Sequence, residues 1–234
     1  EYKETVNINQ FRKELAAITD VKWIDISFIT KDKLKYTKNS IYGYDLKYGS
    51  DVIYGDPSIL NVIPNLTSSN IDLIEGEILF FTRLWTFAGS IGEIKELQGN
   101  NSRFFRNQMS KAILSIVDVI LLMNKQYHHS YINRYEILCS TNDEMISEKL
   151  LKKCKWALEE KLRPKDITMS ERSVEVLYFE VANLYREFML ILLSQRYNRD
   201  FENILEFRNF YKNSLKMNAK RILYILIKRS TRFE

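Results

Sequence analysis

The chain has 234 residues, of which 45% are apolar and 28% charged, and its formal net charge is +5. This length and apolar content allow one large domain or two small ones with a sizeable core. Only 7 glycines and 3 prolines occur, which favours helices, and the longest apolar run, 113–123, holds Asp118 and is too short to cross a membrane. The run therefore predicts a buried helix.

The first 65 residues combine one helix with strand-like segments. Asn7 is a plausible N-cap for a helix over residues 8–19, whose apolar residues line one face. Beyond it, β-branched and aromatic residues favour strands. The expected strands are 23–30, 40–48 and 51–54, the last two placed around the turn signal Gly49-Ser50.

Beyond residue 65 the patterns are helical. Proline, serine, threonine and asparagine between residues 56 and 69 indicate a loop, where we place a domain boundary. The expected helices are 71–97, 104–123, 130–139, 142–162, 170–197, 201–214 and 217–228. The predicted fold class is thus α+β but predominantly α: a small β-sheet piece within residues 1–65, followed by an all-α helical bundle over 66–234.

One acidic residue, Asp25, lies inside the strand-like run Trp23 to Phe28, and a hairpin-like segment ends in Val52-Ile53-Tyr54-Gly55-Asp56. Together they resemble the second half of a nucleotidyltransferase domain of the DNA polymerase β superfamily. The stretches 108–114 and 127–131 are similar to the helical domains that accompany minimal nucleotidyltransferases.

The resemblance implies a two-metal reaction. In this family a Gly-Ser motif holds the nucleotide phosphates, and three carboxylates hold two divalent metals that stabilise the reacting oxygens. Asp25 matches the third carboxylate, as a Mg²⁺ ligand and a base on the acceptor hydroxyl. The expected function is transfer of a nucleoside monophosphate from an NTP donor to an unidentified acceptor.

The chain departs from the family pattern before Asp25. No glycine occurs before Gly43, and no Asp-x-Asp pair precedes Asp25. We therefore expect a preceding segment to carry the Gly-Ser and Asp-x-Asp motifs, and nucleotidyltransferase activity depends on it. The alternative is a non-catalytic nucleotide-, RNA- or protein-binding module with a degenerate nucleotidyltransferase fold.

Further candidate site residues lie on and after the strongest helical pattern. Lys111, with Gln108 beside it, is expected to bind nucleotide phosphates, although a solvated or locally paired lysine is the simpler reading. His128 and His129 follow the end of that helix, where they either cap it or act as a general base or metal ligand. Cys139 and Cys154 belong to no Cys/His cluster, which argues against zinc.

Charge predicts the partners. Residues 196–232 hold ten Lys/Arg and three Asp/Glu, so these C-terminal helices are expected to face nucleic acid or a partner protein, unless they form a solvated surface. A helical ribonuclease of the HEPN type is disfavoured, because neither Arg103 nor Arg106 is followed at the required spacing by histidine. The chain is expected to be cytoplasmic and free of the membrane.

Overall fold

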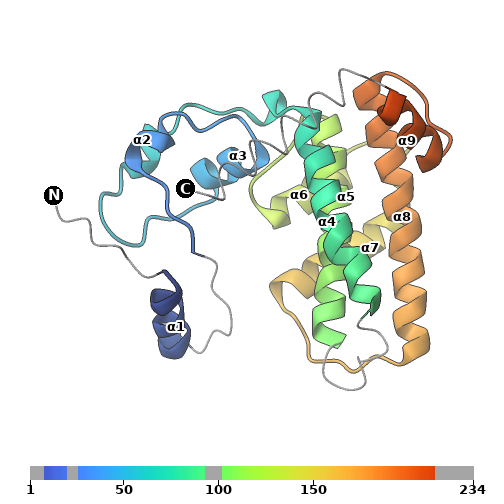
Figure 1. Ribbon diagram of the computed structural model, residues 1–234, viewed down its shortest axis with the longest axis horizontal. Helices are drawn as coiled ribbons and strands as arrows, with labels where there is room; N and C mark the ends of the chain where they lie inside the picture. Colours follow the sequence, from blue (N-terminus) through green and yellow to red (C-terminus); the bar gives the residue numbers. More distant parts are fainter. Residues whose placement is uncertain (1–7, 20–25, 93–101, 214–234) are drawn as a thin grey trace. The chain divides into compact units, whose positions relative to one another are not determined.

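The computed structural model describes residues 8–19, 26–92 and 102–213, and within these ranges every regular element is a helix (Figure 1). In chain order they are α1 (Ile8–Thr19), α2 (Lys31–Leu34), α3 (Ile41–Tyr48), the short 3₁₀ helices η1 (Ile59–Val62) and η2 (Ser68–Asn70), α4 (Leu73–Gly92), α5 (Ser102–Met123), α6 (Tyr131–Ser140), α7 (Glu148–Leu162), α8 (Glu171–Tyr197) and α9 (Ile204–Asn213).

The chain divides into two compact units. Of the described residues, those within 1–38 and 51–65 form the first unit, and those within 39–50 and 66–213 form the second. In the first unit, the Arg12 guanidinium donates to the Ile26 carbonyl at 2.6 Å, which ties α1 to the following segment. Thr30 caps α2 by accepting a hydrogen bond from the Lys33 N–H.

The expected strand 40–48 is wrong, because residues Ile41–Tyr48 form α3. Ser40 is the N-cap, and its hydroxyl accepts from the Gly43 N–H at 3.0 Å. The alternation Ile41-Tyr42-Gly43-Tyr44 suggested a strand, but Ile41 and Tyr44 are also three positions apart. As a helix the segment places both against a buried cluster with Tyr127.

The strands expected at 23–30 and 51–54 are also not found among the described residues. Residues 26–30 and 51–54 have no regular structure, while residues 23–25 lie outside the described residues. Ile53 and Tyr54 are 97% and 96% exposed, so their apolar side chains form no buried sheet face in this structure. The described part of the chain is therefore all-α, and the predicted α+β class is overturned.

The second unit is a bundle built around α5. This helix contacts α4, α6, α7 and α8, and 17 of its 22 residues are buried. A helix that is apolar on nearly every side needs neighbours all round, which is why α5 takes the central place. Among the described residues, no helix is both long and apolar enough to cross a membrane.

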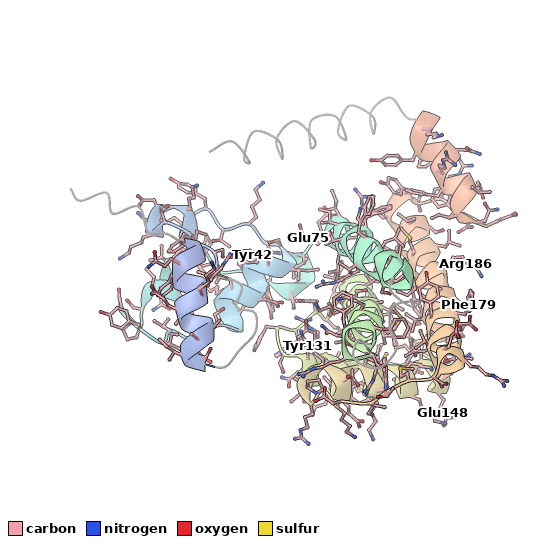
Figure 2. The ribbon with its side chains drawn as sticks, turned by 60° about the horizontal axis from the view of Figure 1, so that its bottom comes forward. Tyr42, Glu75, Tyr131, Glu148, Phe179 and Arg186 are labelled. Carbon is pink, nitrogen blue, oxygen red and sulfur yellow. The ribbon has the colours of Figure 1, made fainter. Side chains whose placement is uncertain are left out.

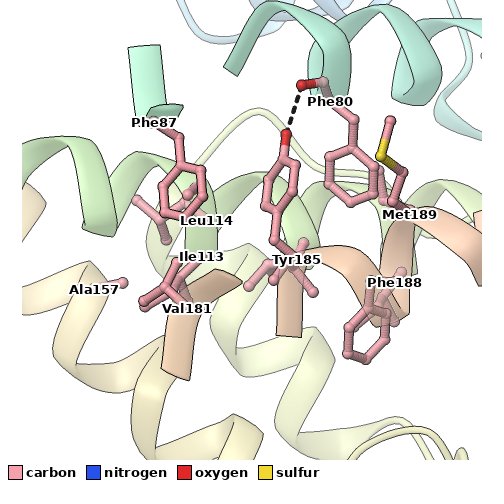
Figure 3. Close-up of a cluster of buried hydrophobic side chains, with 14 of the residues drawn as sticks. Phe80, Phe87, Ile113, Leu114, Ala157, Val181, Tyr185, Phe188 and Met189 are labelled. Carbon is pink, nitrogen blue, oxygen red and sulfur yellow. Dashed lines mark hydrogen bonds between the residues drawn. The ribbon is translucent and has the colours of Figure 1, made fainter. Parts of the chain in front are cut away.

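Aromatic side chains join α4 to α8 over α5 (Figure 3). The Tyr185 hydroxyl donates to the Phe80 carbonyl at 2.6 Å, and the two rings lie 4.7 Å apart. Phe87 stacks on Tyr178 with the same separation between ring centroids. A Cβ at Gly76 would lie 3.2 Å from the Val119 side chain, so glycine permits the close approach of α4 to α5.

Helix boundaries follow local capping. Ser130, Ser147 and Ser170 each accept a backbone N–H three residues later, which starts α6, α7 and α8. The predicted helix 142–162 starts later than expected, because the Asp143 carboxylate accepts from the Met145 N–H in a turn. Pro164 follows the end of α7, as predicted.

Candidate functional site

A pocket of about 660 Å³ lies between α7 and α8 in the helical bundle. It falls within the roughly 300–1,000 Å³ range that small-molecule sites occupy. Three parts of the chain distant in sequence meet here: the start of α5, the middle of α7, and the 163–170 segment with the first turns of α8. The lining residues are Arg106, Lys152, Lys153, Trp156, Ile167, Met169, Arg172, Ser173, Val176, Leu177 and Glu180.

The 163–170 segment is held by the first turns of α5. The Ser102 hydroxyl accepts a hydrogen bond from the Met169 N–H at 3.1 Å, and Arg106 donates to the Lys165 carbonyl at 2.9 Å. Arg106 also forms a buried ion pair with Glu160 on α7. These contacts give the pocket a fixed wall, because Arg106 is held by two elements at once.

Cations dominate the lining. Four lining side chains are Lys or Arg, whereas Glu180 is the sole acidic one. Lys153 pairs with Glu180, and Lys152 pairs at 2.7 Å with Glu148, which is labelled at the start of α7 in Figure 2. Arg172 has no ion-pair partner within the described part of the chain, so its charge is available to an anion.

The pocket combines this charge with an aromatic wall. Trp156 is half-buried, and the lining also includes the apolar Ile167 and Met169. Arg172 and Ser173 belong to the first turn of α8, where the helix dipole favours negative charge, although the Ser170 hydroxyl already accepts from the Ser173 N–H. A planar ring with attached phosphate groups matches both features.

A second polar cluster lies around Arg134 on α6, which is buried. Its guanidinium pairs with Asp118 at 2.9 Å and Asp45 at 3.0 Å, and also bonds to the Tyr127 hydroxyl. The Cζ atom of Arg134 lies 4.4 Å from the centroid of the Tyr127 ring and 4.7 Å from the centroid of the Tyr131 ring. Tyr131 is labelled in Figure 2. One cation therefore joins α3, α5 and α6.

Burial makes the two carboxyl groups of this cluster harder to ionise. Desolvation raises the pKa of Asp118 to about 6, although Arg134 opposes the change. Desolvation also raises the pKa of Asp45, again against the influence of Arg134. The cluster holds one cation and two carboxyl groups, so protonation of Asp118 would leave a balanced pair with Asp45.

Stability should respond to pH through Asp118. Its folded pKa lies above the unfolded value of 3.8, so the folded state binds more protons between about pH 4 and 6. The wild type should therefore gain stability relative to Asp118→Asn as pH falls from about 7 to 4. Urea unfolding of both proteins at several pH values measures this difference. Groups remote from Asp118 cancel in it, whereas Asp45, which shares Arg134 with Asp118, does not. A difference that shrinks or stays constant as pH falls would contradict it.

The two histidines adjoin this cluster. His128 Nδ1 accepts a hydrogen bond from the Ser130 N–H at 3.1 Å, and its ring lies 4.2 Å from that of His129. Desolvation lowers the pKa of His128, and His129 and Arg134 act in the same direction. His129 Nδ1 is buried and has no hydrogen-bond partner among the described residues. Both backbone carbonyls accept from Arg134, so the pair also shapes the loop after α5.

The predicted site residues are not brought together. Asp25 lies outside the described residues, so its role as a catalytic and metal-binding carboxylate stays a prediction. Lys111 is half-buried and Gln108 is buried on α5, and neither lines the pocket. The described ranges contain no group of three or more His, Cys, Asp or Glu residues placed to hold a metal ion.

Sequence reasoning missed both sites for a common reason. Arg106, Trp156 and Arg172 are separated by at least sixteen positions, and no spacing rule links them. Asp118 did carry a signal, because a charge inside a buried apolar helix requires a partner. Its partner Arg134 lies on another helix, and its identity needed the packing of α5 against α6.

Comparison with family models, curated proteins and solved structures finds no match to this chain.

Proposed function

We propose that the helical bundle binds a nucleoside phosphate in the pocket between α7 and α8. This proposal rests on one observation: Trp156 and Arg172 line the same pocket, and Arg172 has no ion-pair partner among the described residues. An indole ring offers a stacking surface for a base, and a guanidinium recognises phosphate oxygens through two parallel hydrogen bonds.

A mononucleotide suits the pocket better than a nucleic-acid strand. The aromatic residue and the cations gather in one pocket of about 660 Å³ rather than along an extended groove. A protein partner is less well supported, because the cores of protein interfaces are depleted in charged residues such as lysine.

Nucleotidyl transfer is a further part of this proposal and rests on the sequence resemblance. In it Asp25 would hold the divalent metal that stabilises the reacting oxygens, as the resemblance implies. Labelled NTP with Mg²⁺, supplied to wild type and Asp25→Ala, tests this part separately from binding. Equal transfer by the two proteins would remove Asp25 from the metal site. A cytoplasmic location also stays a prediction.

Arg172→Ala and Trp156→Leu should each weaken ATP binding. Loss of a hydrogen bond to a charged group costs about 1.5–3 kcal/mol, so the Arg172 variant should bind roughly ten- to hundred-fold more weakly. Loss of base stacking costs about 1–3 kcal/mol, so the Trp156 variant should also bind roughly five- to hundred-fold more weakly. Isothermal titration calorimetry with ATP in the absence of Mg²⁺ measures both effects.

The ligand series separates the two contacts. Ribose 5-phosphate lacks a base and should be insensitive to Trp156→Leu, whereas adenosine lacks phosphate and should be insensitive to Arg172→Ala. Arg186→Ala is the matched control, because Arg186 lies on the same helix outside the pocket (Figure 2). The proposal is wrong if ATP does not bind, or if the Arg186 variant loses as much affinity as the Arg172 variant.

A further inference from the structure

An exposed apolar stripe runs along α4, on the side opposite its buried face. Phe80, Phe87 and Gly76 face the bundle, the two rings being buried and the glycine in close contact with Val119. The stripe, which we call the α4 stripe, consists of Ile74, Ile78, Phe81 and Trp85, which are 37%, 41%, 37% and 83% exposed. A helix that is apolar on both sides is typical of one covered on both sides.

The spacing of the α4 stripe is that of a helix-pairing seam. Its residues follow one another at intervals of four, three and four, which keeps them on one face and matches the repeat of helices that pack side by side. A contiguous exposed apolar patch of this kind marks an interaction site, whereas single exposed apolar residues do not.

The geometry points to a second copy of this chain as the occupant, paired through antiparallel α4 helices. Positions 74 and 85 are equidistant from a point between Leu79 and Phe80, and so are positions 78 and 81. A twofold axis at that point places Trp85 against Ile74 of the other copy and Phe81 against Ile78 of the other copy. Every member of the stripe then meets an apolar partner, as an isologous interface requires.

Charge is compatible with this pairing. The acidic residues nearest the stripe are already engaged within the chain: Glu75, labelled in Figure 2, accepts from the Ile41 N–H, and Glu77 pairs with Arg196. Antiparallel helices also place the positive end of one dipole beside the negative end of the other. When two α4 helices pair, Glu75 and Glu77 therefore keep their partners within their own chain.

The area predicts a weak dimer. On the scale of roughly 150–250 Å² for a fully buried aromatic side chain, the exposed parts of the α4 stripe amount to about 400 Å² per copy. Two copies would bury about 800 Å², which lies below the roughly 1,200 Å² of stable complexes. The share of dimer should accordingly rise with protein concentration rather than be complete.

Sedimentation velocity over two orders of magnitude in concentration tests the proposal. The wild type should shift toward dimer, and Trp85→Glu should stay monomeric over the whole range. Phe179→Glu is the matched control, because Phe179 is an exposed aromatic residue on α8 outside the stripe (Figure 2). This variant should dimerise like the wild type.

Cross-linking tests the register. In a Cys139→Ser background, Ile78→Cys places the two thiols near the twofold axis, and a short thiol cross-linker should join the copies. Ile74→Cys separates them by about 16 Å along the axis, at 1.5 Å per residue, and should not cross-link. Equal cross-linking at both positions would overturn the antiparallel register.

Other results overturn the dimer itself. If the wild type stays monomeric over the whole concentration range, the proposed dimer does not form. If Trp85→Glu then also unfolds at a lower urea concentration than the wild type, another part of the same chain covers the stripe. A dimer that persists in Trp85→Glu places the interface elsewhere on the molecule.

Discussion

Replacement of Arg134 by methionine should lower the free energy of unfolding by about 3–5 kcal/mol, the usual loss when one partner of a buried ion pair is removed. The substitution keeps an unbranched side chain but leaves Asp118 buried without a cation, and removes the hydrogen bonds to Asp45 and Tyr127. Urea unfolding followed by far-UV circular dichroism measures the loss.

The matched control is Arg186→Met. Arg186 is exposed on α8, and among the described residues its guanidinium donates one long bond of 3.4 Å, to Asn183. The change should therefore stay within about 0.5 kcal/mol. The cost of Arg134→Met should also shrink toward pH 4, because protonated Asp118 no longer needs a cation. A loss that is independent of pH would show that packing around Arg134, rather than its charge, supports the fold.

The Arg134 cluster explains why α3 belongs with the bundle although it precedes the loop 51–65. Asp45 on α3 reaches both Arg134 and the Tyr127 hydroxyl. Tyr48, one turn later, exchanges hydrogen bonds with the backbone of Leu66. Polar contacts of this kind fix orientation more than apolar packing does, because they require defined distances and angles.

The same residues show where sequence reasoning failed. The segment 40–48 carries tyrosines and isoleucine, which favour strands in the absence of other information. What decides for a helix is the cap at Ser40 and the fit of Tyr44 against Tyr127, whose ring centroids lie 5.9 Å apart. The cap was readable from sequence, whereas the partner 83 positions away was not.

The long helices were predictable because their periodicity extends over many turns. The expected helix 104–123 corresponds to α5, and 170–197 corresponds to α8 with its cap at Ser170. The pocket was not predictable in the same way. Its four cations come from three helices. Three of these cations form ion pairs with glutamates that the folded chain places beside them, whereas Arg172 has no such partner among the described residues.

Helix α4 allows the separation of folding from association. Phe80→Ala should lower the free energy of unfolding by about 3–5 kcal/mol, because Phe80 is fully buried, its ring packs on Tyr185, and its removal leaves a cavity. Trp85→Ala removes a larger ring from the same helix, yet it should change stability by no more than about 0.5 kcal/mol at low protein concentration.

The two substitutions end in the same residue, so the comparison isolates burial rather than the nature of the new side chain. Urea unfolding of dilute protein gives the two stabilities, and sedimentation of concentrated protein gives the association. Phe80→Ala should lose stability and Trp85→Ala should lose dimer. If Trp85→Ala destabilises the dilute monomer as much as Phe80→Ala does, the outer face of α4 is covered within its own chain, and the stripe is core rather than interface.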